Sequence, residues 1–145
     1  MAFTRTVAGD RYILPEVGNI KPKQPKSGYT AVVGDLVILD TSIANGVDLV
    51  TTNENPYGIV ESINNSNGIL SVAEFVAGCE IELPYTGTVA KGDKIEFAAS
   101  GVHGTTLDRT QIQTDNSNGV GVVVAVDAET PHGTGHAVVR FNGAT

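Results

Sequence analysis

The chain has no tryptophan, one cysteine and no long apolar run. With Cys79 alone, an internal disulfide is excluded. No window approaches the ~20 apolar residues of a membrane-spanning helix, and the N-terminus lacks the apolar core of a secretory signal. We therefore expect a protein that is made in the cytoplasm and has no membrane partner.

Basic side chains are scarce after the first 28 residues. Residues 1–28 contain five of the nine lysines and arginines and carry a formal charge of +3, whereas the rest of the chain carries -10. An acidic body repels the phosphate backbone of nucleic acids, so we expect no nucleic-acid partner. The basic segment is suited to an acidic protein surface.

Glycine is abundant, with 17 residues, and short apolar runs are separated by Gly, Asn, Asp and Pro. This pattern indicates short strands and tight turns. We expect one all-β body over residues 29–145, a small β-barrel or β-sandwich. The run 120–126 is continuously apolar, so we expect it to be covered on both faces. The predicted strands are 36–39, 47–50, 57–63, 69–76, 79–83, 94–97, 120–126 and 136–141.

Residues 1–28 are predicted to form an extended N-terminal arm. Its last part, Lys21 to Gly28, reads as a linker because Pro22 and Pro25 remove backbone donors and the lysines favour solvent. The segment Val7 to Leu14, which contains the strand-like piece 11–14, is expected to add to a strand edge of this chain or to a strand edge or apolar groove of a neighbouring subunit. The residues expected to contact that neighbour are Arg5, Arg11, Tyr12, Ile13, Leu14, Lys21, Lys23 and Lys26.

A Gly-Asp pair precedes a short apolar run three times, beginning at Gly9, Gly34 and Gly92. Glycine permits a turn conformation that is costly for other residues, and aspartate can accept hydrogen bonds from nearby amides. The motif therefore predicts a structural turn rather than a functional site.

The segments around the second and third Gly-Asp pairs follow the same order, which indicates an internal duplication. Two such units closing on each other would make one small barrel or sandwich. The aligned segments are 32–39 with 90–97, 58–64 with 121–127, and 72–75 with 138–141. The residues expected to share one core are Val60, Phe75, Val123 and Phe141.

No motif in the sequence indicates catalysis, and we expect no catalytic residue, metal or cofactor. A phosphate-binding loop fails because Asp93 stands where lysine is required. His132 and His136 flank two glycines, which predicts a solvated loop rather than a metal pair. Cys79 precedes Glu80, which would raise the thiol pKa, so a buried structural cysteine is expected.

The second half of the chain resembles the capsid decoration (cement) proteins of tailed bacteriophages. The stretches that carry the resemblance are Gly78 to Pro84, Gly87 to Phe97, Val120 to Val126 and Ala137 to Phe141. The shared pattern is a strand ending in Leu-Pro, a Gly-Asp turn into a strand, a Gly-Val-rich strand and a closing Val-containing strand.

This resemblance implies a β-tulip-like module without catalytic residues. It implies that the chain binds the outer surface of the mature phage head and joins neighbouring major capsid subunits. The implied partners are the major capsid protein and further copies of this chain, in a homotrimer. The implied location is the virion, after synthesis in the host cytoplasm.

Two other functions stay open. The chain could be a binding module of a phage tail or for a host surface. It could also be a small β-barrel ligand-binding protein or enzyme, which would need a pocket with convergent polar groups.

Overall fold

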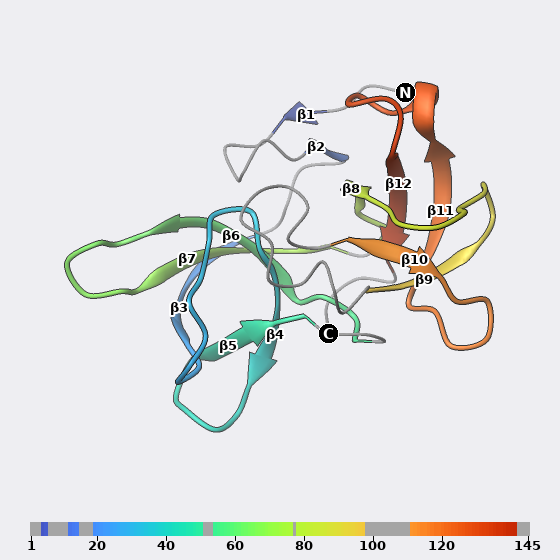
Figure 1. The fold of residues 1–145 in the computed structure, drawn as a ribbon. Coiled ribbons are helices and arrows are strands. Elements are labelled where there is room, and N and C mark those ends of the chain that lie inside the picture. Colours follow the sequence, from blue (N-terminus) through green and yellow to red (C-terminus); the bar gives the residue numbers. More distant parts are fainter. Residues whose placement is uncertain are drawn as a thin grey trace.

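The structure is a computed structural model that describes residues 19–50, 54–76, 78–97 and 111–141, and the backbone of two short strands nearer the N-terminus (Figure 1). Regular structure in these ranges is β apart from the 3-10 turn η3 (Asp127–Glu129), which confirms the all-β prediction. None of the described helical structure is long and apolar enough to cross a bilayer. The strands are β1 (Thr4–Arg5), β2 (Tyr12–Leu14), β3 (Ile20–Pro25), β4 (Leu36–Asp40), β5 (Gly46–Leu49), β6 (Gly58–Ile63), β7 (Leu70–Glu74), β8 (Glu80–Pro84), β9 (Lys94–Phe97), β10 (Ile112–Thr114), β11 (Gly121–Val126) and β12 (His136–Phe141).

The first unit is a closed barrel with the strand order β3-β5-β4-β6-β7. All neighbours are antiparallel except β3 and β5, which run parallel and complete the closure. The β6–β7 hairpin turns where the sequence predicts it, with Gly68 at a φ of 74°. Apolar side chains on one face of the strands fill the interior, as alternation along a strand requires. These are Val37, Val47, Val60, Leu70 and Val72.

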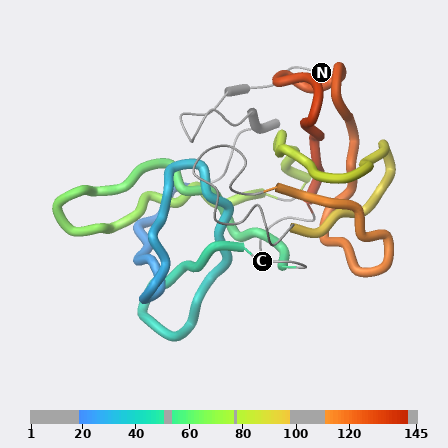
Figure 2. The backbone as a smooth tube through the Cα atoms, viewed as in Figure 1, coloured from blue at the N-terminus to red at the C-terminus, as the bar shows by residue number. Residues whose placement is uncertain are grey.

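The second unit lies beside the first and contains β8 to β12 (Figure 2). These strands belong to a seven-stranded sheet with the order β1-β2-β8-β12-β11-β9-β10. A parallel bridge between Tyr85 and Ile112 connects the chain just after β8 to β10. The five neighbouring strands β8, β12, β11, β9 and β10 therefore curl toward a barrel of their own.

The strand order of the first unit is repeated in the second. The order β3-β7-β6-β4-β5 corresponds to β8-β12-β11-β9-β10. In both units the first and last of these strands meet in parallel, at Gln24 and Gly46 in one and at Tyr85 and Ile112 in the other. The topology therefore contains the predicted duplication, but each unit curls on itself instead of the two closing into one barrel. It also includes two pairs of strands, β3 with β8 and β5 with β10, that the sequence alignment did not match.

The backbone register corrects the sequence alignment by one residue. Gly58 of β6 pairs with Glu74 of β7, and Gly121 of β11 pairs with Phe141 of β12. Glu74 is therefore the counterpart of Phe141. The alignment that matched Phe75 with Phe141 followed their chemical identity, although Phe75 lies one residue beyond its strand.

The glycine that begins each hairpin is required by close packing. A Cβ on Gly58 would lie 2.4 Å from the carbonyl oxygen of Ala73. A Cβ on Gly121 would lie 2.6 Å from Cγ1 of Val139. Neither position leaves room for a side chain, which explains the repeated glycine.

The Gly-Asp turns make the same contacts in both units. Gly92 has a φ of 92°, and its amide donates to the carbonyl of Val123 at 2.9 Å. The Asp93 carboxylate accepts the amide of Ala90 at 2.9 Å. The structural interpretation of the motif is thus confirmed for these two turns, whereas Gly9 lies outside the described residues. The corresponding residues of the first turn are Gly34, Val60, Asp35 and Val32.

The first part of the predicted linker, from Lys21 to Pro25, belongs instead to strand β3. This strand pairs with β7 through residues 20–23 and with β5 through residues 24–25. Each part therefore has one neighbour only, as in an edge strand. Proline is tolerated in edge strands because a donor on the free side is not needed. For this reason Pro22 and Pro25 do not exclude a strand, and the linker prediction is wrong for these residues.

Strand β11 is covered on one face only. Val123 is buried, but the side chain of Val122 is 41% exposed. The expectation of cover on both faces is wrong because the curled sheet encloses a core on its concave side and leaves the other side of β11 open.

A second, larger core joins the two units. The rings of Phe75 and Phe141 stack with 6.5 Å between their centroids, and those of Phe97 and Phe141 stack with 5.8 Å between theirs. Val123 belongs to the same core, whereas Val60 lies in the interior of the first barrel. The prediction of one shared core is therefore right for three of its four residues and wrong for Val60, because each unit encloses its own interior.

Candidate functional site

Strand β8 is the place where the N-terminal segment joins the second unit (Figure 1). Ile13 of β2 pairs with Ile81, and Leu14 pairs with Glu80, while β12 pairs along the other edge of β8. Because side chains alternate along a strand, Glu80 and Glu82 point to the same face, opposite the core residue Ile81. β8 thus presents two carboxylates beside a docked segment.

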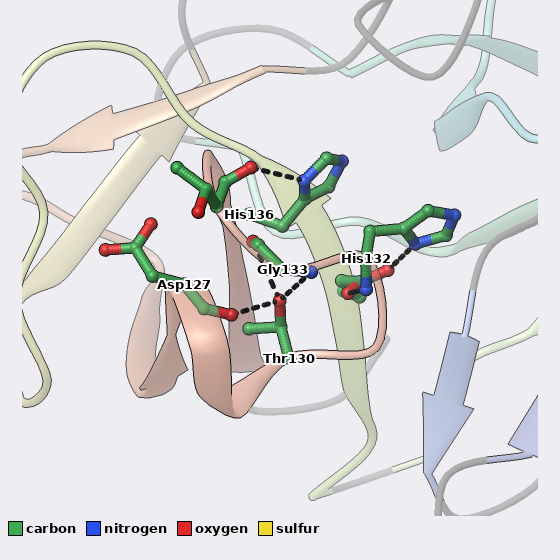
Figure 3. A network of polar contacts seen from close by, with 7 residues as sticks. Asp127, Thr130, His132, Gly133 and His136 are labelled. Atoms are coloured by element: carbon green, nitrogen blue, oxygen red, sulfur yellow. Dashed lines mark hydrogen bonds and ion pairs between the residues drawn. The ribbon is translucent and has the colours of Figure 1, made fainter.

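Glu82 is only 2% exposed and holds the loop between β11 and β12. Its Oε2 accepts the backbone amide of His132 at 2.6 Å, and its Oε1 contacts the ring nitrogen Nδ1 of His132. The rings of His132 and His136 stack with 5.0 Å between centroids (Figure 3). His132 is solvent-exposed, as the prediction of a solvated loop requires, but the sequence did not indicate that its ring contacts a buried carboxylate from 50 residues earlier.

A second group of contacts ties the same loop to the end of β8. The Asp127 carboxylate accepts the hydroxyl of Tyr85 at 2.7 Å and the amide of Gly135 at 3.0 Å. These two donors, first the Gly135 amide and then the Tyr85 hydroxyl, lower the pKa of Asp127. The Thr130 hydroxyl donates to the Asp127 carbonyl at 2.9 Å and accepts the amide of Gly133 at 3.0 Å (Figure 3). The loop is therefore a fixed part of the surface around β8.

Glu80 pairs with Leu14, the last residue of β2, and is 6% exposed. Its Oε2 accepts hydrogen bonds from Nε and Nη2 of Arg140, at 3.0 and 2.5 Å. Its Oε1 is buried and has no hydrogen-bond partner among the residues that the structure describes. Next to it, burial and then the Glu80 charge raise the pKa of the Cys79 thiol to about 11. This confirms the prediction of a buried structural cysteine, and such a thiol is a weak nucleophile.

The N-terminal residues predicted to contact a neighbour reach a strand of their own chain. Arg5 of β1 pairs with Tyr12, and β2 in turn pairs with β8. Arg11 lies outside the described residues. With β3 assigned to the barrel, residues 1–18 contain two arginines and two acidic residues, so their formal charge is balanced.

The three predicted contact lysines lie in or next to β3, apart from the N-terminal strands. Lys21 is part of the ladder with β7. Lys23 lies 5.3 Å from the ring centroid of Tyr57, and Lys26 lies 3.5 Å from a carboxylate oxygen of Asp40. The structure therefore does not bring these lysines together with Tyr12 to Leu14. Their positive charge belongs to the first barrel.

Each unit has an open groove of about 400 Å³ where its parallel pair of strands diverges. Their equivalent positions follow from the duplication. In the part of the chain that the structure describes, no three His, Cys, Asp or Glu side chains form a group able to hold a metal ion. His103 lies outside that part. The grooves are lined by Lys26, Ser27, Gly28, Tyr29, Thr30, Asp48 and Leu49 in the first unit and by Thr86, Gly87, Thr88, Gln113 and Thr114 in the second.

Glu80 and Glu82 were not identified from the sequence as site residues. The alternation of side chains in Cys79 to Leu83 places both acids on one face of the strand. It does not indicate that they are buried. A comparison of the chain with protein-family models, curated proteins and solved structures finds no match. A functional proposal therefore depends on the geometry around β8 and on the sequence resemblance.

Proposed function

We propose that this chain is a structural protein of a tailed bacteriophage that binds the outer surface of the mature head and connects neighbouring major capsid subunits. The observation that carries the proposal is the N-terminal hairpin, which adds to β8 as an edge pair. A segment that attaches by backbone pairing can attach to another strand edge in the same way.

The elements that carry the sequence resemblance support the proposal by their arrangement. β8 ends in Leu83-Pro84, the Gly92-Asp93 turn leads into β9, and the Gly-Val-rich β11 lies between β9 and β12. These elements form one continuous sheet, so the residues of the resemblance make up a single folding unit. The proposed partners are the major capsid protein and further copies of this chain.

The N-terminal hairpin is proposed to exchange its own β8 for a strand edge on a neighbouring subunit. In the described part of the N-terminal segment, two residue pairs, Ile13–Ile81 and Leu14–Glu80, connect β2 to β8. The exchange replaces this ladder with an equivalent one, so its net cost in hydrogen bonds is small. The exchange is favoured where the partner buries the side chains of Tyr12, Ile13 and Leu14 more fully than β8 does, since a large side chain that goes from exposed to fully buried contributes roughly 1.5–3 kcal/mol.

Co-sedimentation with undecorated expanded heads of the same phage tests this function. We expect the full chain to sediment with the heads and a chain lacking residues 1–18 to remain folded but bind severely more weakly. A Lys21→Gln variant is the matched control, because this lysine lies on β3, and it should bind nearly as the parent does. Absence of binding by the full chain would contradict head attachment, whereas equal binding by the shortened chain would contradict only the role of the hairpin.

A further inference from the structure

One face is buried in the first unit and exposed in the second. Leu36, Ile59 and Ala73 are paired neighbours on β4, β6 and β7, and all three are fully buried in the core that joins the units. The same positions on β9, β11 and β12 carry exposed side chains. These counterparts, which we call the outer strip, are Lys94, Val122 and Arg140.

Within the chain, this face of the first unit packs into the core at one end of the second unit. That end of the second unit differs from the equivalent end of the first barrel. In the second unit, Phe97 and Phe141 are buried and Phe75 stacks on Phe141. Their counterparts in the first barrel are Leu39 and Glu74, which we call the open end. Leu39 is 46% exposed and Glu74 is half-buried. The first barrel thus has the receiving end without the aromatic cover.

We propose that the outer strip of one copy packs against the open end of the next copy. This head-to-tail contact would repeat between chains the contact that joins the two units within one chain. Val122 and Leu39 are two of the four exposed large hydrophobic side chains among the described residues. Val122 lies in the outer strip and Leu39 at the open end, so the proposed contact would bring them together.

Charge also favours this pairing. The outer strip presents the cations of Lys94 and Arg140, and the open end presents the carboxylate of Glu74. Within the chain, Arg140 bonds Glu80 but its side chain is 54% exposed. Because the outer strip has two charged residues where the first unit has Leu36 and Ala73, the contact between copies is less apolar than the contact within a chain. It is therefore weaker and depends on salt.

The main alternative is that the charged strip is a cap. Terminal units of repeat proteins carry a polar outer face that prevents further stacking. In that case the chain stays monomeric at every concentration. The proposal concerns contacts between copies and holds or fails independently of head attachment.

Disulfide trapping tests the geometry of the contact. A mixture of Leu39→Cys and Val122→Cys chains should form a disulfide-linked heterodimer under mild oxidation, whereas each variant alone should give no linked dimer. Cys79 is buried and remains a silent background. The control mixture pairs Leu39→Cys with Ser66→Cys, on the exposed tip of the β6–β7 hairpin, and should not link. Linked dimers of one variant alone, or no linked heterodimer, would overturn the head-to-tail contact.

Sedimentation equilibrium tests its electrostatics. We expect the parent chain to associate as its concentration rises, and Lys94→Glu to raise the dissociation constant about tenfold or more through like-charge contact with Glu74. Adding Glu74→Lys to that variant should restore association. Ser66→Glu adds the same charge at the hairpin tip and should leave association unchanged. A monomeric parent, or a double variant that stays as weak as Lys94→Glu, would refute the proposal.

Discussion

The ring of Phe75 stacks on the ring of Phe141, with 6.5 Å between centroids and 11° between planes. Phe75 directly follows the last strand of the first barrel, and Phe141 ends the last strand of the second unit. The ring of Phe97 also stacks on that of Phe141, with 5.8 Å between centroids. This aromatic column is a direct apolar link between the units, which are otherwise built on the same plan.

The counterpart positions Phe97 and Leu39 provide a matched test of that link. Phe97→Ala should lower the free energy of unfolding by about 3–5 kcal/mol, because it leaves a cavity in a packed core. Leu39→Ala should cost less, about 1 kcal/mol, since nearly half of the leucine is exposed. Urea unfolding of both variants gives the comparison. Equal losses would mean that the second unit has no special aromatic core.

The contact between Glu82 and His132 predicts a large cost for removing the histidine. His132→Ala removes the ring partner of the buried Glu82 carboxylate, which keeps the backbone amide of residue 132, and should lower the free energy of unfolding by about 1–3 kcal/mol. His136→Ala removes the stacked neighbour, whose contact from ring nitrogen Nδ1 to the Thr134 carbonyl oxygen is long at 3.4 Å, and should cost much less. Urea unfolding at neutral pH measures both, and a loss at His136 as large as that at His132 would speak against the role of Glu82.

Tyr57 predicts a loss of stability at high pH. Burial, followed by the hydrogen bond and charge of Glu74, raises the pKa of Tyr57 to about 12. The folded state therefore holds its proton where the unfolded chain, with a pKa near 10, releases it. The stability contributed by this group is complete below pH ~10 and is lost as pH rises toward about 12. The hydrogen bond to Asp127 also raises the pKa of Tyr85, so absorbance titration should show the tyrosinate of Tyr57 forming as the last step, and Tyr57→Phe should remove that last step. A last step that persists unchanged in Tyr57→Phe would assign it elsewhere.

The Gly-Asp turn predicts a backbone effect without a steric one. A Cβ on Gly92 would meet no heavy atom within 4 Å, but its φ of 92° is strained for other residues. Gly92→Ala should therefore cost about 1–3 kcal/mol. Lys91→Ala, next to it, removes only a surface ion pair with Glu129 and should cost less than about 1 kcal/mol. Thermal unfolding distinguishes the two, and an unchanged midpoint for Gly92→Ala would show that the turn is not constrained.

Local signals in the sequence were sufficient for most strands and for the repeated turns. The Gly-Asp pairs and the apolar runs predict β4, β6, β9 and β12 because strand and turn preferences depend on neighbouring residues. Strand β3 was missed because its lysines and prolines read as solvated, and its position at the barrel seam is a property of the tertiary fold. The burial of Glu82 was missed for the same reason, since its partner His132 is distant in the chain.

The most direct test of the account is a cryo-electron microscopy reconstruction of the mature phage head. We expect density for the two-unit body on the outer surface, over the junctions between major capsid subunits, with the N-terminal segment paired as a strand with a neighbouring subunit. A head whose outer surface carries only the major capsid protein, or density for this chain on the tail instead, would contradict the proposed function.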